Sequence, residues 1–232
     1  MSSNPQNKTI VDNIDTINVE QTLNRTEDFL KKNRQIIAYV ALGMLALVAV
    51  WIFFATYFLP NREKEAQSQL FAAERYFEMD SLDKAIKGDG NNLGFEQIRD
   101  DYSWTKSANL CNYYLGVSYL KKGQFENAID ALNKFDSKDQ IVAPIAKGAL
   151  GDAYLELDKT ENAFVAYRDA ANTSANNFTT PYFLLKAGQV AEKLSKNQEA
   201  LALYQRISDD YKTSMEFFEI GKYIARAEAK IK

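Results

Sequence analysis

Histidine is missing from the 232 residues of this chain, and cysteine occurs once, as Cys111. Histidine is the side chain that most often serves as a base, proton shuttle or metal ligand near neutral pH. Its absence excludes Ser-His and Cys-His nucleophile systems. A single cysteine excludes a disulfide framework and any multi-cysteine metal site. We therefore expect no enzyme, no cofactor and no metal, and a buried structural thiol at Cys111, which lies in an apolar helical pattern.

Glycine and proline are also scarce, with 10 and 4 residues. A β-rich chain needs more of both for its turns. The phosphate-binding patterns GxxxxGK(S/T) and GxGxxG are absent, because Gly88, Gly90 and Gly94 have the wrong spacing. Apolar residues recur three and four positions apart, so the expected fold class is all-α. The net charge of -3 does not indicate a nucleic-acid surface, and we expect neither nucleic acid nor a small-molecule substrate as a partner.

One long apolar segment divides the chain. Residues 36–59 form 24 consecutive positions without a charged side chain. A helix rises about 1.5 Å per residue, so this length spans a hydrocarbon core of roughly 30 Å. A buried core helix is the alternative, but a helix that is apolar on every face needs a large protein around it. The segment has no acidic, basic or amide side chain of the kind that transport requires, so we expect a single transmembrane helix that acts as a tether.

The charges on either side of this segment predict its orientation. Lys31, Lys32 and Arg34 lie just before it, whereas basic and acidic residues alternate over residues 62–65 after it. Lys and Arg favour the cytoplasmic side of a membrane, and Asp and Glu contribute little. We therefore expect residues 1–35 to be cytoplasmic and residues 60–232 to lie on the opposite side.

A repeated pattern follows the apolar segment. Four residues of one copy recur in the next copy with the same types and the same spacing. Leu115, Gly116, Tyr119 and Ala128 correspond to Leu150, Gly151, Tyr154 and Ala163. The glycines of this frame lie 35, 37 and 33 residues apart, at Gly116, Gly151, Gly188 and Gly221. These periods bracket the roughly 34 residues of the tetratricopeptide repeat, a pair of helices with the pattern W-x2-L-G-x2-Y and then A-x3-F. Residues 109–142, 144–177 and 181–213 resemble three such repeats, in which the usual tryptophan is replaced by Asn112, Lys147 and Leu184.

Two further segments extend these repeats, so that we expect an α-solenoid of about four repeats with a capping helix. Residues 66–102 resemble a degenerate first repeat with an inserted loop, which is a candidate contact for a partner and consists of Gly88, Asp89, Gly90, Asn91 and Asn92. The alternative is a solvated loop that breaks a helix. Residues 214–231 are expected to form a capping helix with a polar outer face. Its apolar side chains are expected to face the neighbouring helices or to form an interaction surface: Met215, Phe217, Phe218 and Tyr223.

The first helices of stacked repeats line a concave groove. Positions 2, 5, 9 and 12 of each repeat are the candidate protein-binding residues, namely Leu110, Tyr113, Val117, Leu120, Ile145, Gly148, Asp152, Leu155, Tyr182, Leu185, Gln189 and Glu192. This mixed apolar and acidic groove suits extended or helical segments of other proteins. Packing against neighbouring helices is the alternative role of these side chains. Related domains that clamp the carboxylate at the end of heat-shock proteins use lysine and asparagine at positions 5 and 9, which are absent here.

The whole arrangement resembles the YfgM-like family of ancillary subunits of the bacterial Sec translocon. The resemblance covers residues from about 27 to 220, including the amphipathic entry at 27–32, the anchor, residues 72–76 and 94–102, and the repeats. It implies an inner-membrane protein with a cytoplasmic amino terminus and a periplasmic repeat domain. Such a protein lies beside the Sec channel and assists exported chains, or passes them to periplasmic chaperones. The alternative is a scaffold for cell-envelope assembly or cell-division machinery.

Overall fold

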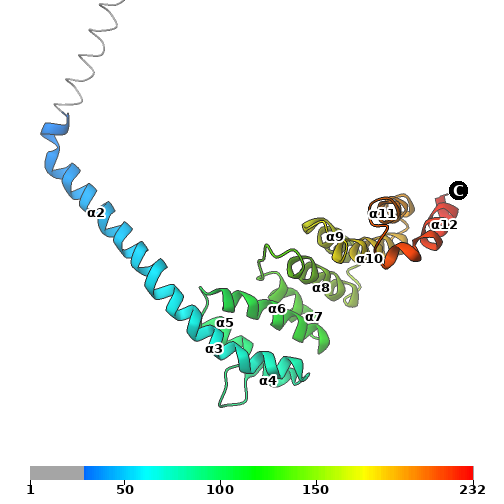
Figure 1. The fold of residues 1–232 in the computed structure, drawn as a ribbon, viewed down its shortest axis with the longest axis horizontal. Coiled ribbons are helices and arrows are strands. Elements are labelled where there is room, and N and C mark those ends of the chain that lie inside the picture. Colours follow the sequence, from blue (N-terminus) through cyan, green and yellow to red (C-terminus); the bar gives the residue numbers. More distant parts are fainter. Residues whose placement is uncertain (1–28, 232) are drawn as a thin grey trace, which may run out of the picture. The chain divides into compact units, whose positions relative to one another are not determined.

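The computed structural model describes residues 29–231, so most of the predicted cytoplasmic segment lies outside the described residues. The chain divides into two compact units, Met1–Phe58 and Leu59–Lys232. The described part of each unit is built from helices, and residues 29–231 contain no strand (Figure 1). The predicted all-α fold class is confirmed.

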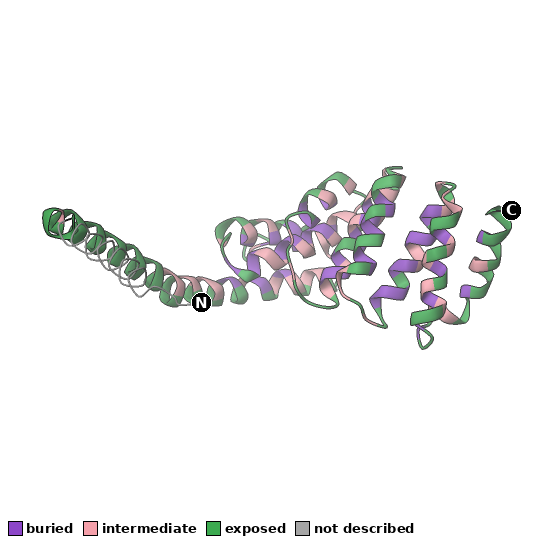
Figure 2. Cartoon of the chain, turned by 90° about the horizontal axis from the view of Figure 1, so that it is seen from above, coloured by how far each residue is buried: buried purple, intermediate pink, exposed green. Residues whose placement is uncertain are grey.

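The main described element of the first unit is an apolar helix. Helix α2 spans Arg34–Phe53, and a π-helical turn at Phe54–Phe58 follows it. No residue of α2 is buried, and Figure 2 shows the helix as exposed along its length. The helical run Arg34–Glu78 contains the one stretch among the described residues that is long and apolar enough to cross a membrane. The prediction of one long apolar helix is therefore confirmed.

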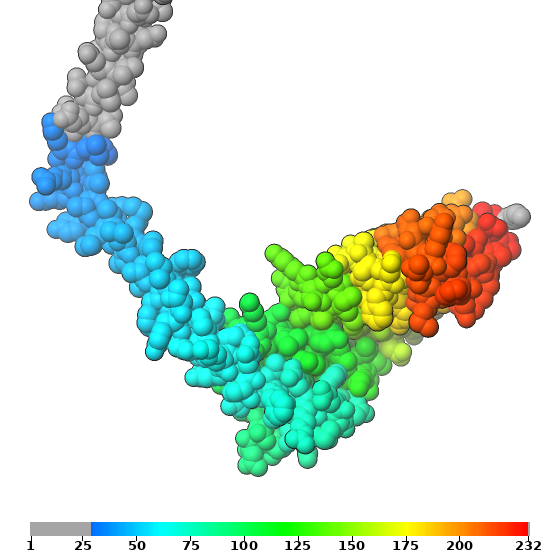
Figure 3. All heavy atoms as spheres, viewed as in Figure 1, coloured from blue at the N-terminus to red at the C-terminus, as the bar shows by residue number. Residues whose placement is uncertain are grey.

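The second unit is a stack of antiparallel helix pairs. Its helices are α3 (Leu59–Glu78), α4 (Leu82–Lys87), α5 (Phe95–Asp101), α6 (Lys106–Lys121), α7 (Phe125–Leu132), α8 (Val142–Glu156), α9 (Thr160–Thr173), α10 (Thr179–Lys193), α11 (Asn197–Asp210) and α12 (Ile220–Ile231). From α5 onward, each helix packs against the next one in the chain. The colours of this unit in Figure 3 accordingly follow one another in sequence order. Such nearest-neighbour packing is the architecture of a solenoid.

Glycine allows the two helices of a pair to approach closely. A Cβ atom added at Gly151 of α8 would lie 2.7 Å from the ring of Tyr167, and one added at Gly188 of α10 would lie 2.2 Å from the ring of Tyr204. Both tyrosines are at most 1% exposed. Gly221 of α12 occupies the equivalent position but has no atom within 4 Å of such a Cβ. The repeat period seen in the sequence is therefore the period of these close contacts.

The first pair differs because its second helix is broken. Residues 88–94 separate α4 from α5, and both helices pack against α3. The break needs glycine at both ends, since a Cβ on Gly94 would lie 2.4 Å from the carbonyl oxygen of Ile86, and Gly88 has φ of +84°. Cys111 of α6 is packed in this part of the core, as expected from the sequence. Burial raises the pKa of its thiol to about 12, so the reactive thiolate is scarce at neutral pH.

The last helix begins later than residues 214–231 predicted. Helix α12 starts at Ile220, after a short 3-10 turn at Glu216–Phe218 in which Ser214 Oγ accepts a hydrogen bond from the backbone N–H of Phe217 (3.3 Å). Arg226 and Lys230 of α12 donate to Glu192 of α10 at 2.9 and 3.2 Å. Burial raises the pKa of the Glu192 carboxyl, but these two cationic donors lower it overall. The ion pairs therefore attach α12 to α10.

Candidate functional site

A pocket of about 530 Å³ opens between the first helices of three successive pairs. Helices α6 and α8 provide one part of its lining, and the start of α10 provides another. The segment before α12 closes one side. The lining residues are Tyr113, Val117, Leu120, Ile145, Ala149, Asp152, Asn177, Phe178, Thr179, Tyr182, Phe183, Met215 and Glu216. Most of the lining residues are apolar or aromatic, as in ligand-binding pockets generally.

The pocket brings together half of the predicted groove positions. Six of them line it, namely Tyr113, Val117, Leu120, Ile145, Asp152 and Tyr182. The other positions lie elsewhere because neighbouring helices cover them. Leu110, Leu155 and Leu185 pack against the core clusters. The ring of Phe183 occupies the space beside Gly148, where an added Cβ would lie 2.0 Å from it.

Two predicted groove residues at the end of α10 instead hold the last helix. Gln189 donates a hydrogen bond to the hydroxyl of Tyr223 at 3.3 Å. The Glu192 side chain is 7% exposed and accepts from the two basic residues of α12 described above. The part of the groove that these positions would line is therefore covered by α12.

Aromatic rings line the pocket and pack against neighbouring rings. Phe183 is 4% exposed and meets Tyr182 edge to face, with ring centroids 5.0 Å apart. On the other side, the ring of Tyr113 lies 5.5 Å from that of Phe135. Burial raises the pKa of Tyr113, so its hydroxyl is neutral at physiological pH. These rings are held by their neighbours and present a fixed apolar surface.

Large apolar side chains stand exposed around the mouth of the pocket. Phe178 is 71% exposed, Met215 is 85% exposed and Tyr182 is 44% exposed. We refer to Phe178, Tyr182 and Met215 as the apolar rim. Exposed apolar side chains that gather around one pocket are typical of interaction sites.

Two aromatic residues at this pocket, Phe178 and Phe183, were not among the predicted groove positions, and the predicted role of Met215 left its exposure open. Asn176 provides a local signal for the position of Phe178, because its side-chain oxygen accepts from the backbone N–H groups of Phe178 (2.9 Å) and Thr179 (2.7 Å). Asparagine favours such turns directly before a helix. Phe183 carries no comparable local signal, since it packs on the preceding repeat.

Two carboxylates line the pocket, those of Asp152 and Glu216, and the first of them is paired with a lysine. Asp152 accepts hydrogen bonds from the hydroxyl of Tyr167 and from Lys186 Nζ, the latter at 2.5 Å. The Lys186 ammonium also lies 5.1 Å from the ring centroid of Tyr167 and 5.3 Å from that of Tyr182. Burial lowers the pKa of Lys186, but the bond and charge of Asp152 raise it overall. The ammonium therefore stays charged and neutralises Asp152.

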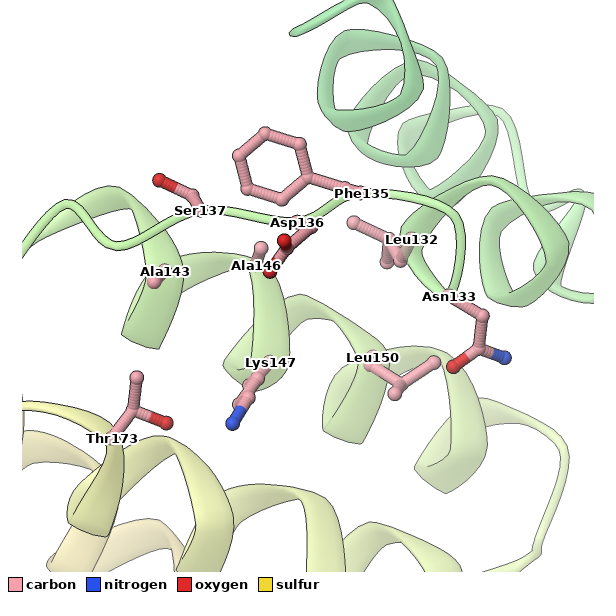
Figure 4. A pocket seen from close by; sticks show the side chains of 10 residues that line it. All are labelled: Leu132, Asn133, Phe135, Asp136, Ser137, Ala143, Ala146, Lys147, Leu150 and Thr173. Carbon is pink, nitrogen blue, oxygen red and sulfur yellow. The ribbon is translucent and has the colours of Figure 1, made fainter. Parts of the chain in front are cut away.

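A second, smaller pocket of about 250 Å³ lies under the loop between α7 and α8 (Figure 4). Leu132, Ala146 and Leu150 form its apolar part, and Lys147 points in from α8. Asn109 fixes the position of the loop. Its side-chain amide donates a hydrogen bond to the backbone oxygen of Asp136 (2.7 Å) and accepts one from the backbone N–H of the same residue (3.0 Å). None of the predicted groove or loop residues lines this pocket.

The candidate contact loop is organised by Asp89. One oxygen of its carboxylate accepts from the backbone N–H groups of Asn91 (2.9 Å) and Asn92 (2.7 Å), and the other accepts from the hydroxyl of Tyr76 (2.6 Å). These donors, with Tyr76 contributing most, hold the pKa of Asp89 well below its usual range. The carboxylate is thus engaged within the loop and with α3.

Replacing Asp89 with alanine is expected to speed hydrogen exchange of the Asn91 and Asn92 amides, because their common acceptor is lost. Asp130→Ala, an exposed change on α7, should leave this exchange unchanged. The folded-state pKa of Asp89 lies below its unfolded value of about 4, so its stabilisation is complete above that pH and is lost as the pH falls through the folded-state pKa. Equal exchange in both variants would contradict this role.

Comparisons with known proteins agree with this architecture. The tetratricopeptide repeat model matches residues 111–139 and 182–214. The chain is similar to two crystal structures of a Podosopora anserina protein described as a putative kinesin light chain with nearly identical TPR-like repeats, one of them a variant with a single substitution. The variant has 15% identity and a TM-score of 0.53 over 73% of this chain and 87% of that one. The other has 16% identity and a TM-score of 0.54 over 73% and 88%.

No curated protein matches the sequence at a significant level. At such low identity, the structural similarity shows the fold alone. The chain therefore contains tetratricopeptide repeats, and its second unit is a tetratricopeptide-like solenoid, as the sequence predicted. Solenoids of this kind are protein–protein interaction modules that present an extended binding surface.

Proposed function

We propose that this protein is a membrane-tethered module whose pocket between α6, α8 and α10 binds an apolar segment of another protein. The observation that carries the proposal is the apolar rim, formed by Phe178, Tyr182 and Met215 around a pocket of about 530 Å³. A pocket of this size admits one or two large side chains. Aromatic side chains at the rim contribute contact area at low cost in side-chain entropy.

The tether in this proposal is α2. Its 20 residues carry no buried side chain, and the basic residues before it favour a cytoplasmic amino terminus. The repeat unit would then lie in the periplasm of a bacterium, attached to the inner membrane. This placement supplies the pocket with segments of proteins that cross or enter that membrane.

Within this placement, the proposed role is that of a chaperone-like accessory of the Sec translocon that assists exported chains. The resemblance to the YfgM-like family supports this role, and the exposed rim suits the transient binding of unfolded segments. The alternative is a scaffold for cell-envelope assembly or cell-division machinery, which uses the same kind of pocket for a folded, permanent partner.

Photo-crosslinking from the rim tests the proposal. A photoreactive residue in place of Phe178, in the full chain in native membranes, is expected to capture exported chains and Sec channel subunits. Met215→Glu should reduce capture about tenfold, because one buried anchor of an interface is worth more than about 1 kcal/mol. Met215 is 85% exposed, so this change does not disturb the core.

Met79→Glu is the matched control, since Met79 is 57% exposed and lies outside the pocket. Equal capture by the two glutamate variants would show that the pocket is not the binding site. Capture of division or outer-membrane components would favour the scaffold. Capture of cytoplasmic proteins alone would show that the membrane helix has the opposite orientation.

A further inference from the structure

We infer that the pocket selects segments in which a bulky apolar side chain is flanked by lysine or arginine. This inference rests on the proposed function of the pocket as a protein-binding site. It adds the charge of the partner to its apolar character.

The carboxylates at the pocket are Asp152 and Glu216, and no lysine or arginine lines it. Asp152 is neutralised by Lys186 at 2.5 Å. Among the described residues, no hydrogen bond or ion pair reaches the carboxylate of Glu216. The pocket therefore presents one uncompensated negative charge, and this charge comes from the segment that precedes α12.

The position of Glu216 places this charge beside the apolar surface. Glu216 directly follows Met215, a residue of the apolar rim, and it lines the same pocket as Val117 and Ile145. A segment whose apolar side chain enters between α6 and α8 therefore brings a neighbouring residue toward Glu216. A lysine or arginine at that place pairs with the carboxylate, and its aliphatic stem covers Met215.

An acidic segment has no counterpart in this pocket. The Lys186 ammonium is bound to Asp152 of the lining and lies 5.1 and 5.3 Å from the ring centroids of Tyr167 and Tyr182. An incoming carboxylate would have to break this pair and would also meet Glu216. The pocket thus discriminates against acidic segments as well as favouring basic ones, which is how charge confers specificity on an interface.

Fluorescence anisotropy with labelled eight-residue peptides tests this preference on the full chain in phosphatidylcholine nanodiscs, with empty nanodiscs as the blank. One peptide has a Leu-Phe centre between two lysines, the second has the same centre between two glutamates, and the third has a Ser-Ser centre between two lysines. The first is expected to bind at least about threefold more tightly than the second, because an exposed ion pair changes affinity up to about fivefold. Salt at about 0.5 M should reduce this ratio.

Glu216→Gln is expected to remove most of the preference for the basic peptide. Glu228→Gln is the matched control, because Glu228 is an exposed carboxylate on α12 that does not line the pocket. Far-UV circular dichroism checks that both variants retain their helices. Equal binding of the lysine and glutamate peptides would overturn the inference and leave the proposed function intact. Binding of the Ser-Ser peptide as tightly as the Leu-Phe peptide, or binding of none of them, would overturn both.

Discussion

Gly188→Ala is expected to destabilise the repeat unit by about 2 kcal/mol, because the added methyl group has no space. It would lie 2.2 Å from Cε1 of Tyr204 and 2.7 Å from its Cζ. Tyr204 is fully buried, so its ring cannot move without displacing its neighbours. Overpacking of a core costs about 1–3 kcal/mol and sometimes more, and the better helix propensity of alanine offsets about 1 kcal/mol of it. Only the close contact with α11 makes this glycine necessary.

Gly221→Ala is the matched control for this prediction. It makes the same chemical change at the same position of the repeat frame, but an added Cβ there meets no atom within 4 Å. Alanine should therefore be neutral or stabilise α12 by up to about 1 kcal/mol. Urea denaturation of the full chain in mild detergent, followed by far-UV circular dichroism, measures both effects. Equal stabilities of the two variants would contradict the close approach of α10 and α11.

Phe95→Ala is expected to cost about 4 kcal/mol, within the range for truncation of a buried phenylalanine. Phe95 is fully buried at the start of α5. Its ring stacks on Tyr114 of α6 with centroids 4.9 Å apart and meets Phe77 of α3 edge to face at 6.4 Å. The variant therefore loses these ring contacts and leaves a cavity between α3, α5 and α6.

Phe71→Ala removes the same side chain from an exposed position on α3, where Phe71 is 68% exposed, and should change stability by no more than about 0.5 kcal/mol. Hydrogen exchange of the Phe95→Ala variant adds a second readout. Because each repeat of a solenoid contacts only the adjacent repeats, the loss of protection should be confined to α3–α7, with α10 and α11 unchanged. Loss of protection in all helices would indicate a single cooperative core instead.

The helical fold and the phase of the repeats could be read from the sequence because the deciding contacts are local. Gly151 and Tyr167 lie 16 residues apart, as do Gly188 and Tyr204, and each pair joins the two helices of one repeat. Such contacts recur at the repeat period, and the residue types that make them therefore recur at the same period. Residues 88–94 interrupt this periodic pattern, and the helix is broken between α4 and α5 at the same residues.

The candidate pocket could be predicted only in part. Tyr113, Val117 and Leu120 line it because they share one face of α6, which helical spacing predicts. Gly148 belongs to the same frame but is covered by Phe183 of the next repeat. Glu192 is likewise covered, since it accepts from Arg226 of α12. The spacing within one repeat does not record these contacts, because the covering residues lie about 35 positions away.

The sequence by itself determined that residues 29–231 are helical, that one apolar helix precedes the solenoid, and that a glycine and an alanine recur twelve positions apart in the repeats, as at Gly116 and Ala128 and at Gly151 and Ala163. These properties depend on spacings shorter than one repeat, which the chain records as periodicity. The tertiary structure alone decided that Phe178 and Met215 stand exposed around one pocket and that Glu216 carries its uncompensated charge. The pocket joins residues from position 113 to position 216, so its shape follows from the packing of successive repeats on one another.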